Sequence, residues 1–190
     1  MILPRFALIC LLALAGATAA PAADLPRPGQ PGYIRPSPDL GKTDAQCRAG
    51  EAGPAIVVTV DGFRDRVGMA RVEVYPPTDE DFLQADNKLV MAGKLFRRVE
   101  VPVTPSGPMQ LCIRVPSPGN YTLSVLHDRD SNHKYGLSVD GVGVPNNPRI
   151  CFGKPRAAAV TFRAGPGITT LPITLQYRRS LFCLGPHNPG

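Results

Sequence analysis

Apolar residues recur at every second position in seven short runs of this chain, and turns rich in Gly and Pro separate the runs. The runs cover residues 55–60, 69–75, 99–103, 109–115, 121–125, 160–162 and 171–175. Side chains point alternately to the two faces of a strand, so this spacing is typical of half-buried strands. The pattern predicts an all-β fold: a single antiparallel β-sandwich of about seven strands, immunoglobulin-like or transthyretin-like, with one short crossover helix.

Two features refine that prediction. Pro102 and Pro172 lie inside predicted strands, and because proline has no backbone N–H, we expect both strands at sheet edges. The helix is expected after the Pro76-Pro77 stop, where Thr78 precedes Asp79, Glu80 and Asp81 as an N-cap precedes an acidic first turn. Its apolar face would comprise Phe82, Leu83, Leu89 and Val90.

The N-terminus has the pattern of a secretory signal. Arg5 precedes an apolar run over 6–15, and small-residue cleavage patterns end at Ala19 and Ala22. We therefore expect a signal peptide over 1–22 and a periplasmic or secreted protein, with no transmembrane segment in the mature chain. The Pro- and Gly-rich segment 23–53 is expected to be a mobile leader, followed by one domain over 54–178 and a C-terminal tail over 179–190.

The net charge of +6 comes from scattered residues, with basic pairs only at Arg97-Arg98 and Arg178-Arg179. A nucleic-acid site is expected to show a clustered basic stripe. The distribution therefore argues against a nucleic-acid partner.

Four cysteines remain after the predicted cleavage, namely Cys47, Cys112, Cys151 and Cys183. An even number in an exported chain favours disulfides, and three pairings are open. In the run 109–115, Cys112 alternates with the apolar residues and is in step with the polar Gln110 and Arg114, so it faces away from the core. There it can form a disulfide with Cys47 that attaches the leader to the outer face of the sandwich. The sequence thus favours Cys47–Cys112, with Cys151–Cys183 tying the tail to the preceding loop.

Several segments together resemble a known family. The tract from His127 through Asp128, Asp130, Asn132 and Lys134 is similar to the H-D-x-N-x-N-x-K signature of the bacterial DUF2141 family. Residues 143–147 and 152–155 resemble the G-x-S-N-N and F-G-x-P elements of that family, and 58–63 fits its opening strand. The resemblance covers about 55–176. It implies an exported β-sandwich, similar to transthyretin-like or carboxypeptidase-regulatory-type domains, and it implies no activity.

The same tract is a candidate metal site. Asp128, Asp130 and Asn132 have the spacing of the first three ligands of a calcium loop. His133 and Val139 stand where an EF-hand needs Gly and Glu, so an EF-hand is excluded, and Asp140 is the candidate late carboxylate. The favoured interpretation is that these side chains cap their own backbone in Asx-turns. Calcium is the one cofactor that the sequence suggests.

The expected function is a non-catalytic binding or structural module of the cell envelope, monomeric, with an envelope protein or a glycan as partner. Loops held by a rigid scaffold concentrate binding residues, so the predicted binding loop comprises His127, Lys134, Asn146 and Asn147. One alternative is a calcium-stabilised adhesion or polysaccharide-binding module. The other is a hydrolase that uses His127 and Asp128, although the chain has no G-x-S-x-G nucleophile motif.

Overall fold

The computed structural model of the protein describes residues 24–187, so the predicted signal peptide lies outside the described residues. The elements, in chain order, are β1 (Ala55–Asp61), β2 (Met69–Tyr75), α1 (Asp86–Met91), β3 (Arg97–Pro102), β4 (Met109–Arg114), β5 (Gly119–Asp128), β6 (Gly141–Gly143), α2 (Ala157–Val160), β7 (Phe162–Ala164), β8 (Ile168–Thr174), β9 (Gln176–Arg178) and β10 (Leu184–Pro186).

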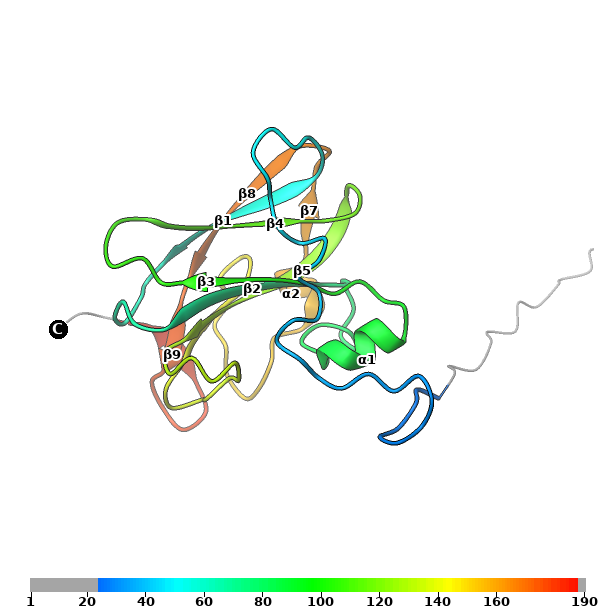
Figure 1. Ribbon diagram of the computed structural model, residues 1–190. Coiled ribbons are helices and arrows are strands. Elements are labelled where there is room, and N and C mark those ends of the chain that lie inside the picture. Colours follow the sequence, from blue (N-terminus) through cyan, green and yellow to red (C-terminus); the bar gives the residue numbers. More distant parts are fainter. Residues whose placement is uncertain (1–23, 188–190) are drawn as a thin grey trace, which may run out of the picture.

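These strands form two layers (Figure 1), which confirms the predicted all-β sandwich. The smaller sheet has the order β4-β1-β8, and the larger has the order β10-β9-β6-β5-β2-β3, with β7 paired to β5. One pair departs from the expected antiparallel arrangement, because β1 and β8 run parallel, with Ile56 opposite Thr169. The predicted edge positions are confirmed: Pro102 lies in the edge strand β3, and Pro172 lies in the edge strand β8.

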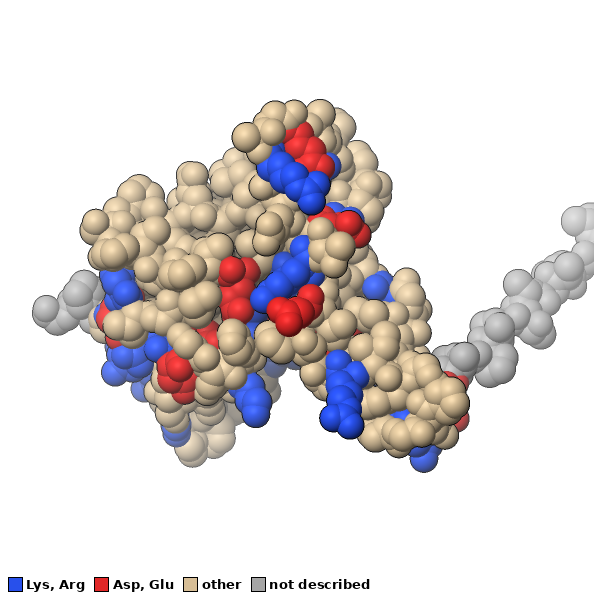
Figure 2. Space-filling view, in the orientation of Figure 1, with Lys and Arg blue, Asp and Glu red and all other residues tan. Residues whose placement is uncertain are grey.

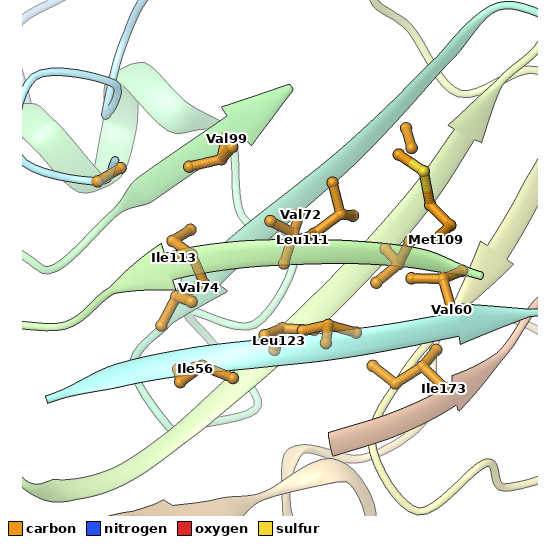
Figure 3. Close-up of a cluster of buried hydrophobic side chains, with 14 of the residues drawn as sticks. Ile56, Val60, Val72, Val74, Val99, Met109, Leu111, Ile113, Leu123 and Ile173 are labelled. Atoms are coloured by element: carbon orange, nitrogen blue, oxygen red, sulfur yellow. The ribbon is translucent and has the colours of Figure 1, made fainter. Parts of the chain in front are cut away.

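The main core fills the space between the two sheets (Figure 3). The alternating apolar residues supply it, and the central positions of both sheets have no exposed surface, including Ile56, Val72, Val74, Ile113 and Leu123. The polar members of the same runs point outward, as period-2 alternation requires. The seven predicted runs correspond to β1 to β5, β7 and β8, although Val160 of the run 160–162 lies in α2. The short strands β6, β9 and β10 were not predicted.

The larger sheet is also covered on its outer face. A second apolar cluster lies there, made of Tyr75, Phe82, Leu89, Phe96, Val144, Ile150, Ala157 and Val160. As a result, residues 121–128 of β5 are buried on both faces of that strand. Loops and both helices form this cover, and some of its side chains also line the pocket described below.

The helix prediction is partly wrong. Thr78 does act as a cap, since its Oγ1 accepts a hydrogen bond from the backbone N–H of Asp81 at 3.1 Å, but it caps a single turn. Leu83 has a φ of 58°, in the left-handed region, and this ends the turn. Helix α1 begins only at Asp86, and the four-residue helix α2 was not predicted.

The interpretation of residues 23–53 as a mobile leader needs correction for the part that contacts the sandwich. Ala45 is completely buried, and its carbonyl accepts a hydrogen bond from the N–H of Arg114 at 2.8 Å. The Nη1 of Arg98 donates to the carbonyl of Ser37, and the sulfur atoms of Cys47 and Cys112 lie 2.08 Å apart. This segment therefore covers the edge of the sandwich, beside α1 in Figure 1.

The predicted tail over 179–190 is also corrected, because its residues 184–186 form β10, which pairs with β9. Cys183 is joined to Cys151, with sulfur atoms 2.16 Å apart. Both disulfides thus have the pairing that the sequence favours. The second one fixes the tail to the loop that precedes α2.

No helix within the described residues is both long and apolar enough to span a membrane. On the face shown in Figure 2, Lys and Arg side chains are interspersed with Asp and Glu and form no continuous stripe. That arrangement agrees with the absence of clustered basic residues in the sequence.

Candidate functional site

The Asp128 tract leaves β5 as a loop that its own side chains hold together. Asp128 is completely buried, and its carboxylate accepts hydrogen bonds from the N–H groups of Asn132 (3.2 Å) and His133 (2.8 Å). The side-chain oxygen of Asn132 accepts one from the N–H of Lys134 at 2.7 Å. Ser131 and His133 have positive φ values of 56° and 61°, which these side-chain contacts compensate.

Asp140 closes the same loop from its far end. One carboxylate oxygen accepts from the N–H of Arg129 at 3.0 Å, and the other accepts from the N–H of Gly136 at 2.6 Å. Both buried carboxylates of the loop thus accept hydrogen bonds from backbone N–H groups four or more residues away. The expected Asx-turns are made by Asp130 and Asn132, which accept from the N–H groups of Asn132 and Lys134.

Three of the four predicted metal ligands converge. Oxygen atoms of Asp128, Asp130 and Asp140 lie within 4.8 Å of one another. Burial, followed by neighbouring carboxylates, raises the pKa of Asp128. Asn132 does not join the set, because its Nδ2 donates to Asp130 at 2.7 Å and its oxygen contacts Lys134. These three carboxylates are the residues that would hold a hard cation in this loop.

His127 lies in the core and not in the loop. Its side chain has no exposed surface; Nε2 lies 2.8 Å from the carbonyl oxygen of Val67, and Nδ1 lies 2.7 Å from the hydroxyl of Tyr177. A carbonyl can only accept, so Nε2 carries the proton and Nδ1 accepts from Tyr177. Burial lowers the pKa of His127, which favours the neutral ring. Both nitrogens already have structural partners, and neither faces solvent.

Three further residues, Asp65, Arg129 and Tyr177, support this end of β5, and sequence reasoning missed all three. The guanidinium of Arg129 contacts both carboxylate oxygens of Asp65, and its Nη1 donates to the carbonyl of Val139. This ion pair lowers the pKa of Asp65 and raises that of Arg129. Burial raises the pKa of Tyr177 to about 12, so its hydroxyl remains a donor. No local pattern pairs residues 64 positions apart.

The predicted binding loop is divided among three places. Lys134 lies at the mouth of a large pocket, whereas His127 is in the core. Asn146 donates to the carbonyl of Ala159 at 3.0 Å, and Asn147 accepts from the N–H of Thr174 at 2.9 Å. The two asparagines therefore brace loops near α2 and β8, and they lie outside this pocket.

The pocket lies on the outer face of the larger sheet and has a volume of about 1100 Å³. Its floor is formed by outward side chains of β2, β5 and β6, including Arg71, Leu126 and Val142. Four segments distant in the sequence form its walls, namely 83–86, 133–137, 150–155 and 180–184. Tyr75, Phe96, Val144 and Ile150 belong to both this pocket and the second apolar cluster.

The rim of the pocket is apolar and exposed. Phe152 is 82% exposed and stacks on Phe182, with ring centroids 5.3 Å apart beside the Cys151–Cys183 bridge. Eight large hydrophobic side chains are exposed among the described residues, and six of them line this pocket: Leu83, Tyr135, Leu137, Phe152, Leu181 and Phe182. Scattered exposed side chains are ordinary, but the gathering of six around one pocket is typical of an interaction site.

One side of the floor is charged. Glu73 accepts a hydrogen bond from Nε of Arg98 at 2.7 Å and also accepts one from the hydroxyl of Tyr75. Burial, together with the neighbouring Glu73, raises the pKa of Tyr75. Nη1 of Arg71 donates to the carbonyl of His133 at 3.0 Å, which links this floor to the Asp128 loop. Strand alternation alone predicts these charged residues to be solvent-facing; distant loops bury them.

The fold and these two features define the chain as a β-sandwich protein with a self-braced acidic loop and an outer-face pocket. A family profile described as "Uncharacterized protein conserved in bacteria (DUF2141)" matches residues 58–171, so the chain belongs to that family. No curated protein and no solved structure matches the chain. The matched region begins within β1 and ends within β8, and it contains β2 to β7, the Asp128 loop and three walls of the pocket.

Proposed function

We propose that this protein is a non-catalytic binding module of the cell envelope that takes an apolar small molecule into the outer-face pocket. The observation that carries the proposal is the gathering of six of the eight exposed large hydrophobic side chains around one concavity. Small-molecule sites are concave and mostly apolar, with a few convergent polar groups. The volume of about 1100 Å³ is sufficient for a ligand of several hundred daltons.

The neutral fluorescent probe N-phenyl-1-naphthylamine tests this proposal, because it has no charge to bind elsewhere on a basic protein. We expect saturable binding at one site. The variant Phe152→Ser/Leu181→Ser removes exposed rim side chains without touching the core, and it should weaken binding at least about tenfold, which corresponds to about 1.4 kcal/mol. The matched control is Val67→Ser/Ile168→Ser, which changes the two large exposed hydrophobic residues of segment 24–187 that lie outside the pocket. Equal binding by the two variants would contradict the proposal.

The proposal includes export. It is supported by the N-terminal signal pattern and by two disulfides, which persist in oxidising compartments. Cell fractionation combined with thiol alkylation and mass spectrometry tests it. We expect the protein outside the cytoplasm with Cys47, Cys112, Cys151 and Cys183 all oxidised; a cytoplasmic protein with free thiols would contradict export.

The non-catalytic part of the proposal is supported by His127, whose two ring nitrogens contact Val67 and Tyr177 in the core. A hydrolase would need this imidazole to reach a substrate. An ester, peptide and glycan panel tests the point. Turnover that His127→Ala abolishes in a folded variant would establish the hydrolase instead.

A calcium-stabilised adhesion or polysaccharide-binding module is the second candidate, favoured by the approach of Asp128, Asp130 and Asp140 to within 4.8 Å. Thermal unfolding in EDTA and in millimolar calcium tests it. The informative variant is Asp130→Asn, because Asp130 is exposed and its loss leaves the buried loop contacts intact. A calcium-induced rise in the Tm of the wild type that this variant loses would support the second candidate. Equal Tm values of the wild type in EDTA and in calcium would exclude it.

A further inference from the structure

The floor of the pocket changes character across the sheet. In one cross-strand row, Glu100 of β3 lies opposite Arg71 of β2, Arg71 lies opposite Leu126 of β5, and Leu126 lies opposite Val142 of β6. All four side chains share the outer face, because directly paired residues point to the same side of a sheet. The β3–β2 side of the floor is therefore ionic, and the β5–β6 side is aliphatic.

Arg71 on the ionic side is incompletely satisfied. Its residue is 7% exposed, and its Nε makes no hydrogen bond to any described residue. Nε lies 3.3 Å from a carboxylate oxygen of Glu73, and Nη1 lies 3.8 Å from one of Glu100, so the guanidinium has charged neighbours without a full set of hydrogen bonds. Buried guanidinium donors without acceptors are costly, and a carboxylate is the acceptor that they fit best.

The ionic side also has an excess of positive charge. Lys134 lines the same end of the pocket as Arg71, because Arg71 donates to the carbonyl of His133, the residue before it. The ammonium of Lys134 has no ion pair among residues 24–187. The cations around the pocket are Arg71, Arg98, Lys134 and Lys154, and the carboxylates are Glu73, Asp86 and Glu100. One negative charge from a ligand would balance this set.

We propose that the ligand class is an amphipathic monoanion: a single-chain carboxylate whose head lies against Arg71 and Lys134, and whose hydrocarbon part lies over Leu126, Val142 and the Phe182 side of the rim. This inference rests on the proposed function, and it adds the chemistry and the orientation of the ligand. A hydrocarbon chain gains free energy in proportion to the apolar area it buries. The charged head adds specificity, since the two cations that line this end of the pocket, Arg71 and Lys134, are its binding partners.

Displacement of N-phenyl-1-naphthylamine by three ligands with the same ten-carbon chain tests the inference. The ligands are decanoate, 1-decanol and decylammonium, each below its aggregation concentration. From this displacement we expect decanoate to have an affinity at least about tenfold higher than that of decanol, and decylammonium to have a lower affinity than decanol. Rising salt should lower the affinity of decanoate and leave the affinity of decanol unchanged, because ionic screening acts on the charged head alone.

Two variants locate the head. Arg71→Gln should reduce decanoate affinity at least about tenfold while leaving that of the neutral probe unchanged. Lys134→Gln, at an exposed position that tolerates substitution, should reduce it several-fold in the same selective way. Arg163→Gln is the matched control, because it removes the same charge from the exposed central position of β7, outside the pocket.

The outcomes separate this inference from the proposed function. Suppose that the neutral probe binds the wild type but not the rim variant, and that decanol and decanoate bind with equal affinity. The pocket then binds apolar molecules, and the inferred preference for a monoanion is wrong. The same conclusion follows if decanoate affinity is unchanged in both Arg71→Gln and Lys134→Gln. If the neutral probe does not bind, the proposed function itself fails. A concentration-dependent dimer that the rim variant abolishes would assign the rim to a second copy of the chain and overturn both.

Discussion

The hydroxyl of Tyr177 lies 2.7 Å from Nδ1 of His127, and this contact joins β9 to the buried end of β5. The same hydroxyl accepts a hydrogen bond from the backbone N–H of Arg64 at 3.0 Å. One oxygen atom therefore satisfies a buried imidazole and the loop between β1 and β2. This contact places the Asp128 loop, which begins one residue later.

Tyr177→Phe removes that oxygen and retains the ring. We expect the free energy of unfolding to fall by about 1–3 kcal/mol, because the buried imidazole of His127 loses its partner and the N–H of Arg64 loses its acceptor. Tyr135→Phe is the matched control, since Tyr135 is 46% exposed and its hydroxyl makes no hydrogen bond to a described residue. Urea unfolding of both variants measures the difference. Equal stabilities would mean that the Tyr177 hydroxyl has no structural role.

Gly68 approaches the Asp128 loop so closely that a side chain has no room. A Cβ there would lie 2.1 Å from the carbonyl oxygen of Asp128, and φ is +77°. Gly107 has nearly the same φ, +79°, and nothing within 4 Å. Gly107→Ala should therefore cost about 1–2 kcal/mol for backbone conformation alone, and Gly68→Ala should cost at least about 1 kcal/mol more for the clash. A similar loss of stability in the two variants would show that the contact is not tight.

The Asp65–Arg129 pair predicts a particular response to acid. The hydrogen bond from Arg129 lowers the pKa of Asp65 below its usual value of 3.8, so the folded state favours the ionised carboxylate. The pair therefore stabilises the fold at pH above about 3.8, and this contribution is lost as the pH falls further, toward the folded-state pKa. Asp65→Asn should lose stability at neutral pH and show a shallower decline in acid than the wild type. Urea unfolding from pH 7 to pH 3 gives the free energy of unfolding of both proteins as a function of pH. Parallel pH dependences would contradict the stabilising role of the Asp65–Arg129 pair.

The Cys151–Cys183 disulfide holds the stacked rim residues Phe152 and Phe182 together. Replacing both cysteines by serine should lower the free energy of unfolding by about 4 kcal/mol in the chain-entropy model, for a separation of 32 residues. It should also weaken binding of the neutral probe, because Phe152 and Phe182 are no longer fixed. Replacing Cys47 and Cys112 is the control: it should cost similar stability, yet leave probe binding unchanged. Equal probe affinity in the two double variants would show that the Cys151–Cys183 disulfide does not shape the pocket.

Much of the fold could be predicted because its signals are local. The alternation in β4 gives both the buried Leu111 and the outward Cys112, and Pro102 marks an edge strand without reference to any partner. The Asx-turns at Asp130 and Asn132 are local as well. The helix start failed because Leu83 adopts a positive φ that no residue pattern indicates.

The pocket could not be predicted for a physical reason. Alternation places Arg71 and Glu73 on the outer face of β2, and such residues are normally solvated. Whether they are buried depends on segments such as 83–86 and 150–155, which meet only in the folded chain. An outward Tyr75 and an apolar Leu126 on the same face were the available hints that this face is covered.

The most direct test of the account is the location of the bound ligand, measured by methyl NMR of Ile-, Leu- and Val-labelled protein during titration with decanoate. If decanoate binds in the outer-face pocket, the methyl signals of Leu126, Val142 and Ile150, which line it, should shift in a saturable way. Val58 and Leu111, which lie between the two sheets, should remain unshifted. Shifts confined to residues outside the pocket, such as Ile168, or no saturable shift at all, would contradict the central claim that this face of the sandwich is a binding site.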